Sequence, residues 1–347
     1  MRDRIDTGII GTGTKGTIWK GIAERHPSFN LTAISDAHRP NIPRSESFSY
    51  YVDYRDLLSS GVEAVFVAPQ TRYRARVVTE ALGRGIHVLC DVPPGRSVQD
   101  IRAIIAAEKK ARGTVLSFAF SHRFCGAVLR VKEMIHSGTY GKILWMKGVF
   151  GKSGGEDFES TWRSNREWAG GGILLDQGIH MLDLFRFFAG DFTEVKSFVT
   201  TSFWNIPLED NAFALLRNSQ NQVAVIHASS AHWKNSFAIE ICLENGYFVI
   251  RGDLSPRGEY GPREELIVYP RQFADGKNVN GIFEESVTLF DAGARYEHEA
   301  DSFADCIYDG SKVPRGSSGD ALQAMKLVYR IYRGDTVWRG RMDTPAV

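Results

Sequence analysis

Thr7-Gly-Ile-Ile-Gly11-Thr-Gly-Thr-Lys-Gly16 is the stretch that decides the fold of this 347-residue chain. Its first four residues have the pattern of a short buried β-strand, and a helical pattern runs from Thr17 to Arg25. Between them, Gly11 permits a tight turn, Gly13 lets the backbone approach a pyrophosphate, and Gly16 lets helix and strand pack closely. The amides and the positive dipole end of the helix favour phosphate there. We therefore expect a phosphate-binding turn made of Gly11, Thr12, Gly13, Thr14, Lys15 and Gly16.

An acidic residue follows the second strand at the spacing typical of dinucleotide-binding folds. The strand 31–35 ends at Asp36, 20 positions after Gly16, where an acid hydrogen-bonds the ribose hydroxyls of the adenosine half. A carboxylate there repels a 2′-phosphate and favours NAD, whereas an arginine close by accommodates that phosphate. His38 and Arg39 come next in the chain. The sequence therefore predicts a dinucleotide site for NAD, with NADP as the alternative.

Helical and strand patterns alternate up to residue 120, which predicts a doubly wound parallel sheet, the Rossmann arrangement. Further strands are expected at 64–68, 87–90 and 114–120, and helices near 53–58 and at 71–84 and 97–111. Ligands of such sheets bind beyond the carboxyl ends of the strands. The residues at two of these ends are therefore expected beside the nicotinamide half of the cofactor: Pro69, Gln70, Asp91 and Pro93.

The pattern changes after residue 121. Helices are expected at 127–137, 296–308 and 319–332, with strand-like runs at 143–150, 195–203, 212–216, 222–228, 237–243, 247–251 and 265–269. Turn signals such as Glu244-Asn245-Gly246 favour antiparallel hairpins. We expect a Rossmann domain over 1–121 and an α/β domain over 122–347 with a large, open, mostly antiparallel sheet. Both faces of the strand 222–228 are apolar, so helices can cover one and a second subunit the other, in a homodimer or homotetramer.

A polar stripe interrupts the most apolar helical pattern of the chain, which follows Gly170-Gly-Gly172. Asp176, His180 and Asp183 are spaced by four and three residues, so one face of a helix would carry all three. Burying such a stripe is costly unless its members pair or line a cavity. A satisfied structural His–Asp pair is one explanation. The dinucleotide site in the same chain favours another, with His180 as a general base oriented by Asp176.

Composition excludes several other classes of function. The net charge of +1 gives no reason to expect nucleic acid or an anionic membrane surface. No apolar run reaches membrane-spanning length, and no apolar signal segment precedes the first strand. The four scattered cysteines suggest neither a disulfide framework nor a metal site. A cytoplasmic protein is expected.

Taken together, these motifs resemble the Gfo/Idh/MocA family, named after glucose–fructose oxidoreductase, inositol dehydrogenase and rhizopine catabolism. The resemblance spans essentially the whole chain and rests on the glycine turn, the stretch 85–93, Arg123-Phe124, Trp162-Arg163 and the stretch 170–183. It implies an enzyme that uses NAD or NADP to oxidise or reduce a ring hydroxyl of a sugar or cyclitol. Asp176 and His180 match the catalytic residues of the family. The residues expected near the substrate are Arg123, Trp162, Arg163 and Asp183.

Two positions depart from the family pattern. Val92 stands where the family has a lysine that hydrogen-bonds the reacting oxygen, and Gln70 and Tyr73 stand where an asparagine and a histidine are usual. Lys152, Arg163 and Tyr73 are candidates for the missing donor. We expect an NAD(P)-dependent oxidoreductase for a sugar-like substrate. Three alternatives stay open: a redox-neutral NAD-using glycosidase or epimerase, a cofactor-binding homologue without turnover, and a reductase of a non-sugar carbonyl.

Overall fold

Six parallel strands form the first sheet of the computed structural model, which describes residues 3–37, 47–254, 260–271, 284–291 and 293–342. The strands are β1 (Ile5–Ile10), β2 (Phe29–Ser35), β3 (Ser49–Tyr51), β4 (Ala64–Val67), β5 (His87–Cys90) and β6 (Leu116–Phe118). Their order is β3-β2-β1-β4-β5-β6. The chain therefore winds outward in both directions from β1 and β4, which confirms the predicted doubly wound sheet. The short edge strand β3 was not predicted.

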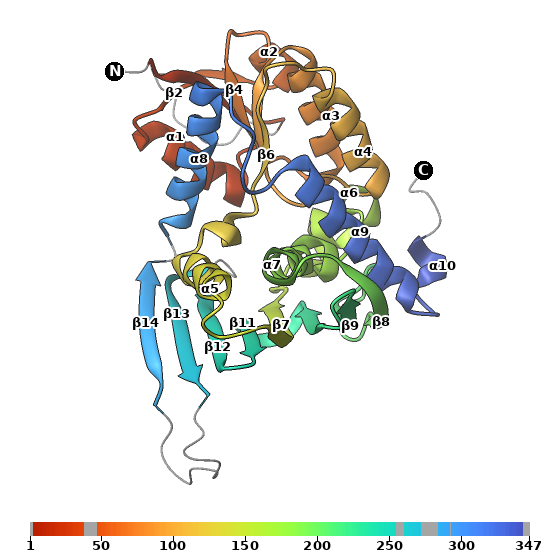
Figure 1. Cartoon of the computed structure of the whole chain (residues 1–347). Helices are drawn as coiled ribbons and strands as arrows, with labels where there is room; N and C mark the ends of the chain where they lie inside the picture. Colours follow the sequence, from red (N-terminus) through yellow and green to blue (C-terminus); the bar gives the residue numbers. More distant parts are fainter. Residues whose placement is uncertain (1–2, 38–46, 255–259, 272–283, 292, 343–347) are drawn as a thin grey trace, which may run out of the picture. The chain divides into compact units, whose positions relative to one another are not determined.

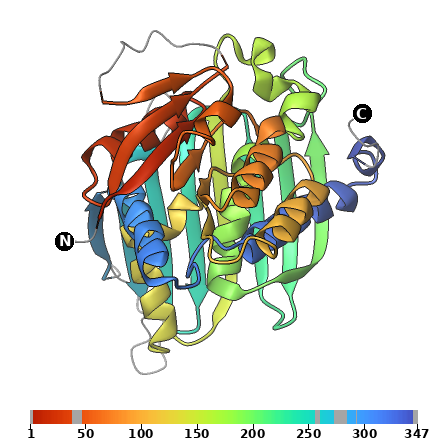
Figure 2. The ribbon, with the colours of Figure 1, turned by 90° about the horizontal axis from the view of Figure 1, so that it is seen from above.

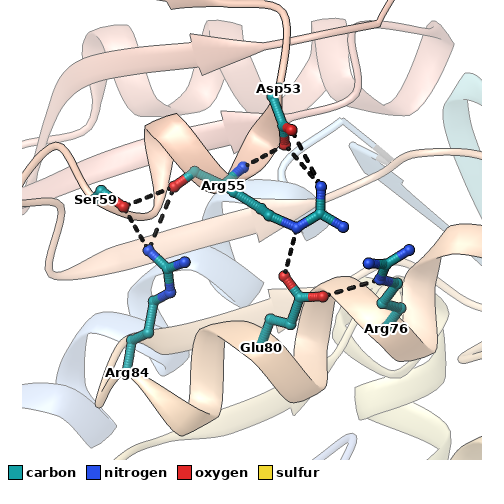
Figure 3. Close-up of polar contacts among 6 residues, drawn as sticks. All are labelled: Asp53, Arg55, Ser59, Arg76, Glu80 and Arg84. Atoms are coloured by element: carbon teal, nitrogen blue, oxygen red, sulfur yellow. Dashed lines mark hydrogen bonds and ion pairs between the residues drawn. The ribbon is translucent and has the colours of Figure 1, made fainter.

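The helices of this region are α1 (Thr14–Arg25), α2 (Tyr54–Leu57), α3 (Thr71–Gly83) and α4 (Val98–Glu108), and α3 and α4 lie side by side (Figure 2). A surface network joins the start of α2 to α3 (Figure 3). In it, Arg55 lies 3.1 Å from Asp53 and 3.3 Å from Glu80, and Glu80 also accepts a hydrogen bond of 2.9 Å from Arg76. The partners are largely exposed, so each pair contributes little stability.

The contacts of the chain divide it into two units, of which the first comprises residues 1–121, 165–170 and 296–325. The later segment joins the first unit through α8 (Arg295–Asp309), whose Phe303 is buried in one apolar cluster with Trp19, Phe29 and Phe66. The sequence pattern, by contrast, divided the chain once, into 1–121 and 122–347. A helix far along the chain closes the first core because its apolar side must be covered. Across the described residues, no helix has the length and hydropathy that crossing a bilayer requires.

The second unit comprises residues 122–164, 171–295 and 326–347 and contains the predicted mostly antiparallel sheet, which has eight strands. The strand order is β14-β13-β12-β11-β7-β10-β9-β8, and Figure 2 shows the strands side by side. The bounds are β7 (Ile143–Ser153), β8 (Phe192–Thr200), β9 (Asn211–Asn218), β10 (Val223–Ser229), β11 (Ala231–Leu243), β12 (Gly246–Leu254), β13 (Tyr260–Pro270) and β14 (Ser286–Asp291). The central strand β7 pairs with β10 in parallel and with β11 antiparallel.

One face of this sheet is buried and the other carries exposed apolar side chains. Helices α5 (Gly126–His136) and α7 (Ile179–Ala189) cover the buried face (Figure 1), and Ala224, Ile226 and Ala228 of β10 lie in the interior. On the other face, Phe198 and Phe213 stand opposite each other on β8 and β9, both exposed. Buried and half-buried residues alternate along β10, which agrees with the predicted division of its two faces. The other α-helices of the described residues are α6 (Arg166–Ala169), α9 (Ser318–Gly334) and α10 (Arg339–Met342).

Candidate active site

The glycine turn of the first unit has the geometry that a pyrophosphate-binding turn requires. Gly11 has φ +90°, and a β-carbon on it would come within 2.6 Å of the Pro69 nitrogen. A β-carbon on Gly16 would overlap the carbonyl oxygen of Gly11, so helix and turn pack as closely as the motif predicts. Gly13, at the N-cap of α1, has no other atom within 4 Å of such a position, which leaves its backbone open to a ligand. The turn therefore fits a dinucleotide.

Asp36, expected at the adenosine ribose, is tied to the same turn. Its carboxylate accepts hydrogen bonds of 2.7 Å from both the amide and the hydroxyl of Thr12. Helix α1 begins at Thr14, three residues earlier than predicted, so Lys15 lies in its first turn. The Lys15 ammonium donates 2.7 Å to the hydroxyl of Tyr296 on α8. His38 and Arg39, which bear on the choice between NAD and NADP, lie outside the described residues.

Arg74 of α3 holds the carboxyl ends of β4 and β5 together, a role that sequence reasoning missed. Its guanidinium donates to the carbonyls of Pro69 and Pro93, at 2.9 and 2.8 Å, and to the Asp91 carboxylate at 2.8 Å. Asp91 is therefore engaged in a buried ion pair, while Pro69 and the neighbouring Gln70 are half-buried. The signal in the sequence was an arginine on the buried face of a helix, in register with Val77, Val78 and Ala81.

The polar stripe of the second unit begins in a π-helical turn instead of the regular helix that was predicted. Residues Leu174–Gly178 form this turn, η4, and α7 continues from Ile179. Such π turns occur mostly inside α-helices and often at functional sites. The turn carries Asp176, which is 17% exposed, and the first turn of α7 carries His180, which is 8% exposed. One short segment therefore presents both candidate catalytic groups.

A buried carboxylate fixes the start of this segment. Glu209 accepts hydrogen bonds from the amides of Gly172 and Leu174, at 2.9 and 3.1 Å, and from the hydroxyl of Tyr332 on α9 at 2.6 Å. Burial raises the pKa of Glu209, while these donors act in the opposite direction. A β-carbon on Gly172 would overlap the Glu209 carbonyl, which explains a glycine there. No periodic pattern predicts this anchor, because its partners are far apart along the chain.

Asp176 is held by two cations. Lys152 at the end of β7 lies 3.3 Å from its carboxylate, Arg163 in η3 (Trp162–Ser164) lies 3.5 Å away, and Gln177 donates at 2.8 Å. Burial alone would raise the pKa of Asp176, but Lys152 and Arg163 outweigh it, so the pKa lies well below its usual value. The carboxylate is therefore ionised, and it orders two side chains that were candidates for the missing donor. The Arg163 guanidinium also lies 4.5 Å from the Trp162 ring centre.

His180 lies against a second imidazole that sequence reasoning missed. The ring centres of His122 and His180 are 5.0 Å apart, and His122 stacks on Phe237 of β11 at 5.1 Å. Because His122 is part of η1 (Ser121–Phe124), its position follows from the turn before α5. The signal was weak: His122 directly precedes Arg123, which the family motif did single out.

Arg123 and Asp183, both predicted near the substrate, form a buried ion pair. Two parallel hydrogen bonds of 2.7 Å join the guanidinium to the carboxylate, and the guanidinium lies 5.0 Å from the Phe187 ring centre. Both side chains are almost fully buried, at 5% and 1% exposure. The pair therefore fastens η1 to α7, a structural role that the prediction did not foresee.

Comparison with known proteins finds matches over most of the chain. Residues 5–119 match a domain described as oxidoreductase family, NAD-binding Rossmann fold, and residues 128–249 match the GFO/IDH/MocA C-terminal domain. The uncharacterized oxidoreductase YrbE of Bacillus subtilis is 29% identical over 241 residues, 66% of this chain and 68% of that protein. D-Glucoside 3-dehydrogenase of Escherichia coli is 32% identical over 150 residues, 43% of this chain and only 42% of that protein.

Among solved structures, levoglucosan dehydrogenase in complex with NADH and levoglucosan has a similar fold. Its TM-score is 0.83, at 19% sequence identity and with 98% of both chains covered. At 19% identity, this similarity shows that the two chains share a fold.

Proposed function

The chain belongs to the Gfo/Idh/MocA family of NAD-binding oxidoreductases, and we propose that it moves a hydride between NAD and a carbinol carbon of a sugar, cyclitol or sugar derivative. The observation that carries the proposal is the segment 172–183, which holds a buried imidazole four residues from a carboxylate bound to two cations. The names of relatives, levoglucosan dehydrogenase and D-glucoside 3-dehydrogenase, support a carbohydrate substrate. The Asp36 carboxylate, bonded to Thr12 of the glycine turn, supports NAD over NADP because it would repel a 2′-phosphate.

In the oxidative direction, NAD held by the glycine turn and Asp36 would supply the hydride acceptor. His180 takes the hydroxyl proton as general base, which suits an imidazole whose ordinary pKa is about 6.5. The Asp176 carboxylate, whose side-chain partners are Lys152, Arg163 and Gln177, stabilises the imidazolium through its charge, four residues away on the same segment. The substrate leaves as a ketone, and the proton leaves from His180 to solvent.

Negative charge develops on the substrate oxygen and needs a hydrogen-bond donor. The side chain of Val92 cannot donate, so another residue must supply the hydrogen bond. Of the three candidates, Lys152 and Arg163 contact Asp176. The Tyr73 ring instead packs edge to face against the Trp168 ring, with ring centres 6.1 Å apart. We assign the donor role to Lys152, since its ammonium is the closer of the two cations and is largely shielded from solvent. A single donor of this kind is worth about a hundred- to a thousand-fold in rate.

The test is His180→Ala, assayed for sugar-dependent NADH formation and for NADH affinity by fluorescence titration. Turnover should fall by about a hundred- to ten-thousand-fold, while the dissociation constant of NADH stays within about two-fold, since His180 is no part of the glycine turn. His136→Ala, an exposed histidine on α5, is the control.

Retained activity in the His180 variant would refute the assigned base. Tightly bound NAD with a converted sugar and no net NADH would favour the redox-neutral alternative. NADH binding by a wild-type protein without turnover on any sugar would favour the cofactor-binding homologue.

A further inference from the structure

Three aromatic side chains of the second unit form a rigid cluster that is open to solvent. Phe203 and Trp233, 59% and 63% exposed, pack edge to face with ring centres 4.7 Å apart, and Trp204 lies 5.0 Å from Phe203 and 6.4 Å from Trp233. We call Phe203, Trp204 and Trp233 the aromatic shelf. Exposed aromatic rings in contact with one another are typical of a binding surface.

The aromatic shelf stands at the edge of the sheet where Lys152 also lies. Strand β10 runs parallel to β7, and β9 runs antiparallel to both β10 and β8, so β7, β8 and β10 point the same way. Their carboxyl ends therefore share one edge of the sheet. Lys152 is the second-last residue of β7, Phe203 and Trp204 follow β8, and Trp233 follows β10 closely in the chain.

A buried carboxylate holds the aromatic shelf in place. Asp210, which is fully buried, accepts hydrogen bonds from three successive amides, those of Ser202, Phe203 and Trp204, at 2.8, 2.7 and 3.0 Å. The indole nitrogen of Trp204 donates at 3.0 Å to the Ser230 carbonyl. These hydrogen bonds to buried groups hold the loop in place while its aromatic rings face solvent. The exposure of the rings is therefore a fixed feature of the fold.

Two chain segments connect the aromatic shelf to the cations on Asp176. Gly154 leaves room for the indole, because a β-carbon there would come within 2.7 Å of Trp204, and Gly154 is two residues from Lys152. The Phe158 ring lies 5.0 Å from Trp204, and the Phe158 carbonyl accepts a hydrogen bond from Ser164, the neighbour of Arg163. The aromatic shelf therefore lies along the same edge of the sheet as the chain segments that carry Lys152 and Arg163.

We propose that the aromatic shelf binds a second sugar ring, so that the substrate is a glycoside or oligosaccharide and not a free monosaccharide. This inference rests on the proposed function. The faces of a pyranose ring are rich in C–H groups and pack flat against aromatic rings, whereas its hydroxyls stay in water around the rim. Rigid aromatic side chains lose little conformational entropy on binding such a ring. Binding energy gained there holds the first ring in position for reaction at His180.

The experiment compares glucose with cellobiose, with NAD as oxidant, in the wild type and in the variants Trp233→Ala and Phe203→Ala. The wild type should use cellobiose with a kcat/KM about ten-fold or more above that for glucose. Each shelf variant should lose most of this preference while its kcat/KM for glucose stays within about two-fold. Val337→Ala, an exposed apolar residue of the second unit between α9 and α10, is the control and should leave the preference intact.

Calorimetric titration of the NADH-loaded protein with both sugars separates the inference from the proposed function. Cellobiose binding that weakens in both shelf variants, in a protein without turnover, would support the shelf and refute the oxidoreductase. The inference would be overturned if the shelf variants lost equal affinity for both sugars, or lost affinity for neither. It would also be overturned if the wild type bound neither sugar. Dissociation of an oligomer by the shelf variants, with sugar preference unchanged, would instead assign the shelf to a contact between copies.

Discussion

At the scale of single residues, Asp176 shows opposing effects acting on one carboxyl group. Burial favours its neutral form, but the Lys152 ammonium and the Arg163 guanidinium favour the carboxylate more strongly, so its pKa lies below the usual 3.8. Because the folded pKa lies below the unfolded one, the ionised group stabilises the fold. That contribution is present in full above about pH 4 and is lost as the pH falls toward the folded pKa.

Asp176→Asn should therefore lower the free energy of unfolding at pH 7 by about 1 to 3 kcal/mol, since two cations lose their charged acceptor. The difference from the wild type should shrink as the pH falls from 5 to 2. Urea denaturation at several pH values measures both effects, with Asp157→Asn, an exposed acid in the next loop, as the control. A difference that stayed constant across this range would mean that folding does not lower the pKa of Asp176.

At the scale of elements, the ends of β4 and β5 depend on one side chain of α3. Arg74 is buried and joins Pro69, Pro93 and Asp91. Arg74→Met should lower the free energy of unfolding by about 3 to 5 kcal/mol, because it leaves the Asp91 carboxylate buried without its partner. Glu80→Gln, in the exposed network of Figure 3, is the comparison and should cost about 1 kcal/mol or less.

Denaturation of both variants in urea measures the two changes, and similar losses would contradict the burial argument. If Arg74→Met folds, its affinity for NADH shows whether the position of Pro69 and Pro93 matters for the cofactor.

Elements with a strong local pattern could be predicted from sequence, and elements fixed by distant partners could not. Strand β1, the glycine turn and α3 follow from periodicity and glycine spacing. By contrast, the π turn Leu174–Gly178 depends on Glu209 and Tyr332, which no local pattern connects to it. Strands β3 and β14 were missed for another reason. The first has three residues, and β14 is almost wholly exposed, so neither shows the alternation of a half-buried strand.

At the scale of the whole molecule, the order of residues along the chain does not map simply onto the two units. Helix α8 was predicted as a helix, but its amphipathic pattern does not say which core it covers. Its Phe303 packs with Phe29 and Phe66 of the first unit. The segment with Asp176 and His180 stands out in the sequence by its apolar surroundings, whereas the residues that contact it do not. Lys152 and His122 lie elsewhere in the sequence and come next to this segment only in the folded chain.

The exposed face of the large sheet leads to the last prediction, which concerns assembly. Phe198 and Phe213 stand side by side, and the exposed Leu215 of β9 pairs with Val225 of β10 on the same face. We expect this face to be covered by a second copy, in a homodimer or homotetramer. Sedimentation velocity at micromolar concentration should therefore show an oligomer. Leu215→Glu should weaken it by about a hundred-fold or more, because a two-fold interface buries the new charge twice.

Val52→Glu is the matched control, since Val52 is an equally exposed apolar residue of the first unit and should leave the oligomer unchanged. The two variants differ only in which surface receives the charge, so a selective effect of Leu215→Glu locates the contact on the sheet. A wild-type protein that sediments as a monomer would contradict the prediction. An oligomer that resists Leu215→Glu would show that another surface joins the subunits and that water covers the apolar rows of β8 and β9.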